Sequence, residues 1–242
     1  MTDPLQHPLD GRVAVLTGVS RPGQVGEAVA RHLAGRGVSV VLIDRTGIDV
    51  EARASELRQS GLEARGYQAD LTNTAQLASV VQSVRDEFGG IDALVNIAGG
   101  FAMSGKVSDS DPEAWARQLS IGLTTAYLTT RAFLPLLRQR RGAVVFFASA
   151  AALPGGRIAE MSAYAVSKAG VITFMRAVAQ EERDTGVRSN ALAPTAIRTT
   201  ANLSSMGDGV RYVEREEVAA AVEFLCFSPA SRVISGQVVQ LG

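Results

Sequence analysis

The stretch Arg12-Val13-Ala14-Val15-Leu16-Thr17-Gly18-Val19-Ser20-Arg21-Pro22-Gly23-Gln24-Val25-Gly26 decides the fold of this chain. Its first six residues form a nearly continuous apolar run of strand length, and a helical pattern follows over Gly26–Arg36. The glycine-rich turn between them lets the backbone bend tightly and approach a pyrophosphate, which the N-terminus of the helix would face. An ordinary strand-to-helix turn is the alternative. The predicted dinucleotide contacts are Gly18, Ser20, Arg21, Gly23, Val25 and Gly26.

Short β-branched runs continue to alternate with longer helical patterns to the end of the chain. Predicted strands cover Arg12–Thr17, Ser39–Asp44, Ala64–Gln68, Ala93–Asn96, Gly142–Ser149, Val187–Ala193 and Gln237–Leu241. Predicted helices cover Gly26–Arg36, Val50–Ser60, Thr74–Phe88, Glu113–Arg140 with a bend, Ser162–Thr185 and Glu216–Phe227. This alternation predicts an α/β doubly wound Rossmann fold, in which helices cover both faces of a mainly parallel seven-stranded sheet. No linker or repeat divides the chain, so we predict a single dinucleotide-binding and catalytic domain over residues 1–242.

Composition excludes several classes of partner. The 24 basic side chains balance 24 acidic ones, so there is no basic surface for nucleic acid or for an acidic membrane. No apolar run approaches membrane-spanning length and the N-terminus lacks a signal-peptide pattern, so we expect a cytoplasmic protein that binds neither nucleic acid nor membrane. The two histidines and the single cysteine form no ligand-spaced cluster, and we expect no metal site.

In a doubly wound sheet, ligands bind beyond the carboxyl ends of the strands. Asp44 ends the second predicted strand, where its carboxylate can accept hydrogen bonds from adenine-ribose hydroxyls and repel a 2′-phosphate. The neighbouring Arg45 and Arg21 would instead favour a 2′-phosphate, and a helix cap or a surface charge is a further role for Asp44. We predict NAD as the cofactor, with NADP as the second choice.

Two more segments end predicted strands at the same edge. Asp70 and Leu71 follow the third strand, where Asp70 either contacts the adenine edge or caps the next helix. Asn96, Ala98 and Gly99 follow the fourth strand in a segment whose small residues permit close packing beside a cofactor. A plain tight turn is the alternative there. All five residues are predicted cofactor contacts.

Tyr164 and Lys168 lie four residues apart in a predicted helix, so their side chains share one face, one turn apart. An ammonium group held there would lower the pKa of the tyrosine hydroxyl below its usual value of about 10. Ser149 ends the fifth predicted strand, where its hydroxyl would hold a substrate oxygen near that of Tyr164. These three residues form the predicted catalytic group. A surface tyrosine packed on a lysine stem and an ordinary loop serine are the alternatives.

The order and spacing of these motifs resemble a short-chain dehydrogenase/reductase (SDR) of the classical type over nearly the whole chain. The matching elements are the glycine motif, Asp70, Asn96-x-Ala98-Gly99, Ser149, Tyr164-x-x-x-Lys168 and Arg188-Ser189-Asn190-Ala191-x-Ala193-Pro194. The resemblance implies hydride transfer between a nicotinamide cofactor and a small-molecule secondary alcohol or ketone. It makes Tyr164 the general acid or base, Ser149 the residue that places the reacting oxygen, and Lys168 a ligand of the nicotinamide ribose.

The resemblance also implies further contacts and a partner. Ile197 and Thr199 match the segment that meets the nicotinamide carboxamide, and Tyr164 and Lys168 would both touch the cofactor. A homo-oligomer, either tetramer or dimer, would form through the long predicted helices. Two other functions stay open: a nucleotide-binding homologue with impaired catalysis, and an SDR site used for elimination, epimerisation or enone reduction.

The chain departs from the family pattern at four places. Its glycine motif is two residues longer, with Gln24 at a usual glycine, and Thr195 replaces a glycine after the proline. Ser149 lies 15 residues before Tyr164, two more than usual. Gly122 stands where the family has an asparagine that is thought to bend the helix and to support a water linking the lysine to solvent. We expect the glycine to allow the bend, and water in the space left by the side chain to continue the relay.

Overall fold

A computed structural model describes residues 8–242 of the chain. Its strands form one seven-stranded sheet in the order β3-β2-β1-β4-β5-β6-β7, and every neighbouring pair is parallel. The strands are β1 (Val13–Thr17), β2 (Ser39–Asp44), β3 (Ala64–Gln68), β4 (Ala93–Asn96), β5 (Ala143–Phe147), β6 (Arg188–Pro194) and β7 (Val238–Leu241). The predicted fold class is confirmed. The predicted single domain over residues 1–242 stays a prediction, because residues 1–7 lie outside the described part.

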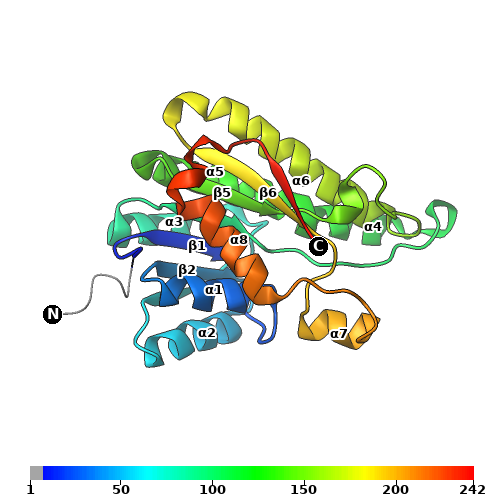
Figure 1. Ribbon diagram of the computed structural model, residues 1–242, viewed down its shortest axis with the longest axis horizontal. Coiled ribbons are helices and arrows are strands. Elements are labelled where there is room, and N and C mark those ends of the chain that lie inside the picture. Colours follow the sequence, from blue (N-terminus) through cyan, green and yellow to red (C-terminus); the bar gives the residue numbers. More distant parts are fainter. Residues whose placement is uncertain (1–7) are drawn as a thin grey trace.

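Helices cover both faces of the sheet (Figure 1). On one face lie α1 (Val25–Gly35), α2 (Gly47–Gln59) and α8 (Arg215–Phe227). On the other face lie α3 (Thr74–Phe88), α5 (Thr125–Arg140) and α6 (Ser162–Glu181). Two shorter helices, α4 (Pro112–Leu119) and α7 (Thr200–Met206), lie at one end of the sheet, and short 3₁₀ turns cover Val107–Asp109, Ala150–Ala152, Arg183–Thr185 and Pro229–Val233.

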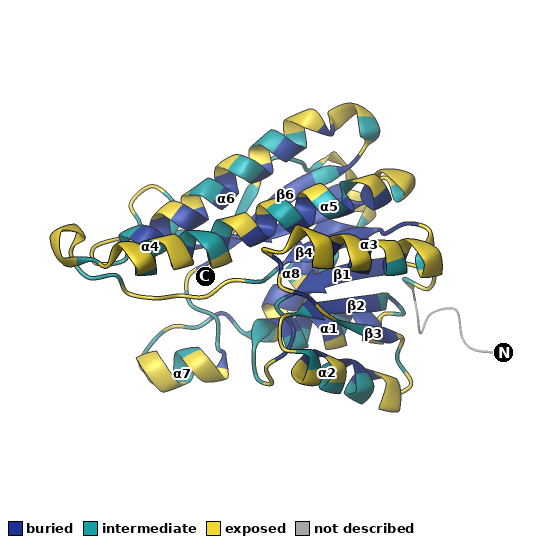
Figure 2. Ribbon diagram, turned by 180° about the vertical axis from the view of Figure 1, so that it is seen from behind, coloured by how far each residue is buried: buried dark blue, intermediate teal, exposed yellow. Residues whose placement is uncertain are grey.

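Each strand supplies side chains to two apolar cores, one under each layer of helices. In β1, Val13 and Val15 pack toward α3, α5 and α6, whereas Ala14 and Leu16 pack toward α1, α2 and α8. All four side chains are buried because successive residues of a strand point to opposite faces and both faces are covered. Figure 2 shows this as dark blue strands between helices with yellow outer faces. The nearly continuous apolar runs in the sequence follow from this double covering.

The predicted bend in the long helix is a π-helical turn over Ser120–Thr124, which joins α4 to α5. Gly122 is buried in the middle of this turn. The Thr125 hydroxyl donates to the carbonyl oxygen of Ile121 at 2.8 Å. This bond satisfies one carbonyl oxygen that lacks its usual α-helical donor in the widened turn. A single wide turn therefore redirects the helix without breaking it.

The structure differs from the predicted elements mainly near element ends. Helix α7 was not predicted, because its seven residues are too few to show a helical period. Its N-cap is Thr199, whose hydroxyl accepts from the Asn202 N–H at 3.1 Å. Helix α8 begins with a capping box, in which the Glu214 and Glu217 side chains accept from each other's backbone N–H groups. Both starts depend on local polar bonds rather than on apolar periodicity.

Within residues 8–242, no helix is both long enough and apolar enough to cross a membrane. The same part of the chain contains no group of three or more His, Cys, Asp or Glu side chains arranged to hold a metal ion.

Candidate active site

A cavity of about 340 Å³ lies at the carboxyl ends of β1 to β4. It is lined by ten of the predicted cofactor contacts: Gly18, Ser20, Arg21, Val25, Gly26, Asp44, Asp70, Leu71, Ala98 and Gly99. Eight other residues that were not assigned as contacts also line it: Gln24, Arg45, Ala69, Thr72, Ile97, Gly100, Ile121 and Thr125. Six of these adjoin predicted positions in the sequence. The other two come from the π turn and the start of α5, which carry no recognisable ligand motif.

The glycine turn after β1 is shaped for a close approach of backbone to ligand. Gly18 has a φ of +75°, and a Cβ atom there would lie 2.8 Å from the Cα atom of Ala98. A Cβ on Gly26 would lie 2.9 Å from the Gly18 carbonyl oxygen. Glycine is therefore required at both positions, and the backbone packing leaves the first residues of α1 on the cavity wall. This cradle fits the pyrophosphate of a dinucleotide.

Gly23 does not line the cavity, although its motif predicted a cofactor contact. Its N–H donates to the Glu27 carboxylate at 2.6 Å, and its carbonyl oxygen accepts from the Thr200 N–H at 3.0 Å. A Cβ on Gly23 would collide with the Thr200 side chain. The lengthened turn therefore reaches the start of α7, which gives the extra residues a contact that the sequence did not reveal.

Asp44 and Asp70 both line the cavity. Asp44 accepts only a long bond from the Thr46 N–H, at 3.3 Å, so most of its acceptor capacity is free for a ligand. Asp70 accepts from the N–H and the hydroxyl of Thr72 at 2.8 and 2.6 Å, and these bonds lower the pKa of its carboxyl group. The alternative role of Asp70 as a helix cap is wrong, because Asn73 caps α3 instead.

Asn96 lies behind the cavity rather than on its wall. Its side chain is buried, and its Nδ2 donates to the Thr130 hydroxyl at 3.0 Å. Its Oδ1 has no hydrogen-bond partner within residues 8–242. The following turn is held by the Thr17 hydroxyl, which accepts from the N–H groups of Ile97 and Ala98 at 3.1 and 3.2 Å. A cofactor contact of Asn96 stays a prediction.

Lys168 and Tyr164 are held at the carboxyl end of β5 by the first turns of α6. Lys168 is 5% exposed, and its ammonium donates to the Phe147 carbonyl oxygen at 2.7 Å. No carboxylate within the described residues forms an ion pair with it. Burial lowers the pKa of Lys168 to about 8. The buried ammonium therefore has a hydrogen-bond acceptor but no counter-charge among the described residues.

Burial raises the pKa of Tyr164, and the neighbouring Ser149 hydroxyl acts in the opposite direction. The expectation that the Lys168 ammonium lowers this pKa is not met in the structure, because desolvation of the phenol outweighs the other influences. The Ser149 hydroxyl is itself oriented by the Ala151 N–H, from which it accepts at 3.2 Å. The structure thus brings Ser149 beside Tyr164 across the longer loop between them.

Ile197 and Thr199 are outside the cavity wall. Ile197 forms an isolated bridge with Val213, and its carbonyl oxygen accepts from the Asn202 side chain at 2.8 Å. Thr199 serves as the cap of α7. Both residues anchor the helix, and their predicted contact with the carboxamide stays a prediction.

A family model described as short chain dehydrogenase matches residues 12–208. This chain belongs to the short-chain dehydrogenase/reductase family. Over 238 residues, covering 95% of the chain and 94% of the relative, it is 34% identical to a 3-oxoacyl-[acyl-carrier-protein] reductase of Synechocystis sp.. It is also 34% identical to a D-beta-hydroxybutyrate dehydrogenase of Cupriavidus necator, covering 79% of the chain and 72% of the relative. The protein is therefore an oxidoreductase that transfers a hydride between a nicotinamide cofactor and an alcohol or ketone.

Solved SDR structures share the whole architecture. A short chain dehydrogenase from Mycobacterium smegmatis superposes with a TM-score of 0.84 at 30% identity, covering 97% of this chain and 92% of that one. The fold is therefore that of the family.

In this SDR chain the space beside Gly122 is filled. A Cβ on Gly122 would lie 2.7 Å from the Ser167 hydroxyl oxygen and 3.2 Å from the Ser167 Cβ. Ser167 is fully buried, and its hydroxyl donates to the Tyr164 carbonyl oxygen at 2.8 Å. The Ser167 hydroxyl therefore lies where a Cβ on residue 122 would point. The expectation that water continues the relay in place of the asparagine side chain stays a prediction.

One exposed apolar side chain, that of Phe101, packs on Tyr164 in this SDR site. The ring of Phe101 meets the Tyr164 ring edge to face at a centroid distance of 5.1 Å and is 58% exposed. The loops after β4 and β5 are joined where the Ser104 N–H donates to the Glu160 carbonyl oxygen at 2.7 Å. Met103 and Ile158 are exposed on these loops. The Phe101 ring therefore places apolar surface beside Tyr164, the predicted catalytic residue.

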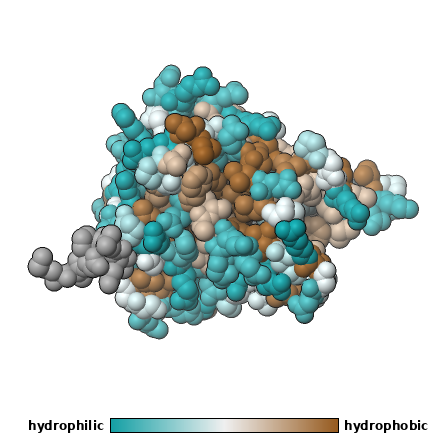
Figure 3. All heavy atoms as spheres, viewed as in Figure 1, coloured by the Kyte–Doolittle hydropathy of each residue, from teal (hydrophilic) through white to brown (hydrophobic). Residues whose placement is uncertain are grey.

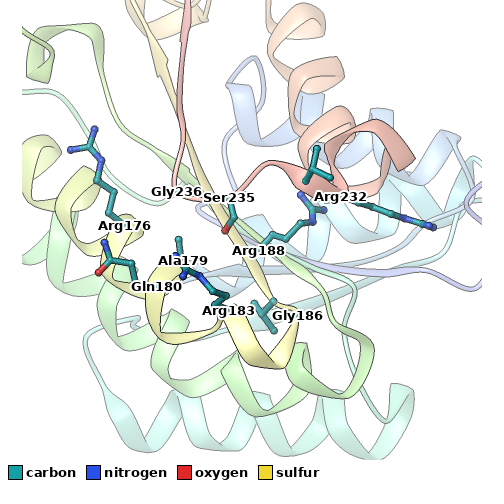
Figure 4. A pocket seen from close by; sticks show the side chains of 11 residues that line it. Arg176, Ala179, Gln180, Arg183, Gly186, Arg188, Arg232, Ser235 and Gly236 are labelled. Carbon is teal, nitrogen blue, oxygen red and sulfur yellow. The ribbon is translucent and has the colours of Figure 1, made fainter.

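A second cavity, of about 480 Å³, lies between α6 and the segment that leads into β7. Four arginines line it, but Figure 4 shows Arg176 and Arg232 pointing to opposite sides. The Arg188 guanidinium donates to the carbonyl oxygens of Leu225, Ser231 and Cys226 at 2.7 to 3.0 Å. None of the predicted site residues lines this cavity, so we place the chemistry at the carboxyl edge of the sheet.

Proposed function

We propose that this oxidoreductase uses NAD and acts on a secondary alcohol or ketone with an apolar body, with Tyr164 as general acid or base. The observation that supports the proposal is that the Lys168 ammonium lies against Gly99, a residue of the cavity wall, although Ser149, Tyr164 and Lys168 do not line the cavity themselves. The Ser149 hydroxyl lies beside that of Tyr164. We also propose that residues 1–242 act as one dinucleotide-binding and catalytic domain.

Side chains of this protein carry out the proton transfer. The Tyr164 hydroxyl gives a proton to the substrate oxygen in reduction and takes it in oxidation, and the Ser149 hydroxyl holds that oxygen in place. Lys168 uses one of its three N–H donors on Phe147, which leaves two for ribose hydroxyls. With a pKa of about 8, Lys168 is mostly charged at pH 7 and stabilises the phenolate form of Tyr164 in the transition state. When bound, the nicotinamide supplies the hydride chemistry.

A preference for NAD rests on Asp44 at the end of β2. Its largely unused carboxylate can accept from ribose hydroxyls and would repel a 2′-phosphate. Arg45 and Arg21 line the same cavity and favour the opposite preference. In Asp44→Ala, the Kd for NAD should rise by more than the Kd for NADP, measured by calorimetry. Arg45→Ala is the matched control, and a wild type that binds NADP more tightly than NAD contradicts the proposal.

The apolar border of the site favours a substrate with a hydrocarbon part next to its oxygen-bearing carbon. Phe101 supplies this surface at Tyr164, and Met103 and Ile158 are exposed on the adjoining loops. The relatives named above act on 3-oxoacyl and 3-hydroxy acid compounds, so we propose these as the first substrate class to test.

We propose a homo-oligomer, a dimer or tetramer, formed through two surfaces. Tyr127 of α5 and Val166 of α6 are 45% and 47% exposed, and the Tyr127 ring packs edge to face on Phe174 at 5.7 Å. Figure 3 shows a second apolar area over the region where Figure 1 draws β7 and α8. Light scattering after size-exclusion chromatography gives the number of subunits, and a monomer at micromolar concentration contradicts this proposal.

The decisive experiment is turnover of a panel of alcohols and ketones, rich in 3-oxoacyl and 3-hydroxyacyl compounds, with each nicotinamide cofactor. Absorbance of the reduced nicotinamide is the readout, and Tyr164→Phe is assayed beside the wild type. We expect turnover that depends on Tyr164. Cofactor binding without turnover across the panel would instead support an impaired nucleotide-binding homologue, and conversion without a change of nicotinamide absorbance would support elimination or epimerisation.

A further inference from the structure

The π turn meets two other parts of the site through three buried residues. Gly122 lies in the turn, Ser167 comes from α6, and Gln118 comes from the last turn of α4. A Cβ on Gly122 would lie 2.7 Å from the Ser167 hydroxyl oxygen and 3.6 Å from the Gln118 Nε2. The absence of a side chain at position 122 therefore makes room for Ser167, whereas Gln118 lies at ordinary contact distance from the same position.

Gln118 links this junction to the loop after β4. Its side chain is 4% exposed, and its Nε2 donates to the Gly100 carbonyl oxygen at 2.8 Å. A buried amide with a well-placed acceptor is a directional tether, because the loss of the donor leaves that acceptor unpaired. The bond joins residues 18 positions apart, so it fixes the loop to the helix rather than stabilising the helix itself.

The tethered residue is the middle one of three that reach the proposed catalytic pair. Gly99, on one side, lies so near the Lys168 ammonium that a Cβ would be 3.4 Å from its Nζ. Phe101, on the other side, packs its ring on Tyr164. Holding Gly100 therefore holds the backbone against Lys168 and the aromatic contact against Tyr164 at the same time.

We propose that Gln118 is a positioning residue for the reaction: its amide holds Gly100 so that the flanking residues keep Tyr164 and Lys168 in place, and Gly122 with Ser167 forms the buried junction against which it packs. This inference rests on the proposed function, because it assigns a role relative to Tyr164 and Lys168. Gln118 forms no hydrogen bond with either of the two side chains, and its action passes through residues 99–101.

Gln118→Met tests the tether, because it keeps the length of the side chain and removes its donor. We expect kcat to fall by about 10- to 100-fold, the scale of a small misplacement of reacting groups. The matched control is Gln82→Met, which removes an exposed amide bonded to Asp86 on α3 and should leave kcat within about twofold. A folded Gln118→Met enzyme with the kcat of the Gln82→Met control overturns the proposal.

Gln118→Glu keeps the proposal testable if the methionine variant does not fold. An ionised glutamate has no donor for the Gly100 carbonyl oxygen, whereas a protonated one has an O–H. We expect the ratio of kcat in Gln118→Glu to wild-type kcat to rise as the pH falls. A ratio that does not change with pH, in a variant as active as the wild type, overturns the tether. A packing role alone would not produce this pH dependence.

A double-mutant test addresses the space at position 122. Gly122→Ala should lower the melting temperature by about 3–10 °C, because its Cβ is forced against Ser167. Ser167→Gly in the same chain removes both opposing atoms and should restore most of that loss. Gly35→Ala in α1 is the matched control, since a Cβ there meets nothing within 4 Å and should not lower the melting temperature. Equal shifts in the two alanine variants overturn the assignment.

These outcomes separate the inference from the proposed function. If the wild type turns over its substrate, Tyr164→Phe does not, and Gln118→Met matches its control, only the positioning role fails. If the wild type shows no turnover with any substrate of the panel, the proposed function fails first.

Discussion

The two ends of the parallel sheet differ in whether their buried charged groups have partners of opposite charge. At the amino end, Asp92 is 5% exposed and is fully partnered: it accepts from Arg12 at 2.7 Å, from Arg140 at 2.8 Å and from the Val13 N–H at 2.9 Å. Glu182 on the same side of the molecule is 2% exposed and accepts from the Arg138 guanidinium at 2.8 Å. Each buried carboxylate here has its counter-charge.

At the carboxyl end, Lys168 is just as buried, yet among the described residues it has only the Phe147 carbonyl oxygen as a partner. The Asn96 Oδ1 there has no partner within residues 8–242, and burial raises the pKa of Tyr164. Uncompensated polar groups cost stability, and they stay reactive because no protein partner occupies them. The comparison indicates that one end of the sheet stabilises the fold and that the other is kept available for chemistry.

The largest expected effect is the loss of turnover in Tyr164→Phe. Removing the only hydroxyl that we assign to proton transfer should lower kcat by about 10²- to 10⁴-fold. The melting temperature should change little, because the ring and its contact with Phe101 remain. Absorbance of the reduced nicotinamide measures the rate. A loss of less than about tenfold would move the proton-transfer role to another residue.

Asp92→Ala should have the largest effect on stability at the amino end. It removes the acceptor of two guanidinium groups and of a buried N–H, so we expect a loss of about 3 kcal/mol in the free energy of unfolding. Urea denaturation measures this loss. The kcat of the folded fraction should stay near wild type, since the site lies at the other end of the sheet. A matching fall in kcat would contradict the separation of the two ends.

Lys168→Met should have the opposite sign: we expect it to stabilise the folded protein while abolishing turnover. The folded pKa of Lys168, about 8, lies below the usual value of about 10.4, so burying the charged form costs up to about 3 kcal/mol below pH 8. The folded state binds fewer protons than the unfolded state between these values. The advantage of Lys168→Met should therefore shrink as the pH rises from 8 to about 10.5. Urea denaturation across this range tests it, and a destabilised variant at pH 7 contradicts the prediction.

Arg12→Ala should have the smallest effect and sharpens the comparison at the amino end. Its side chain is 52% exposed, and Asp92 keeps its bonds to Arg140 and to the Val13 N–H. We expect a loss of at most about 1 kcal/mol in the same denaturation experiment. A loss as large as that of Asp92→Ala would mean that Arg140 does not compensate the carboxylate by itself.

Sequence patterns were sufficient for the parts of the site that follow from strand order. Gly18, Asp44, Asp70 and Ala98 lie on one cavity wall because the carboxyl ends of parallel strands meet at one edge. The pattern could not show that Gly23 turns away to contact Thr200, because a glycine motif specifies backbone freedom and not the direction of the turn. The pKa of Tyr164 was predicted with the wrong sign because burial is a property of the packed molecule.

The sequence alone was enough to predict the parallel sheet and the two layers of helices, because local patterns of apolar and polar residues indicate each strand and helix. The spacing of Tyr164 and Lys168 is likewise a local pattern, four residues apart in one predicted helix. Only the tertiary structure decided what surrounds that pair. Gly122 appears in the sequence as a missing side chain, whereas in the folded chain the Ser167 hydroxyl fills its place and Gln118 passes beside it to Gly100. Such contacts join residues that are distant along the chain, and no local period records them.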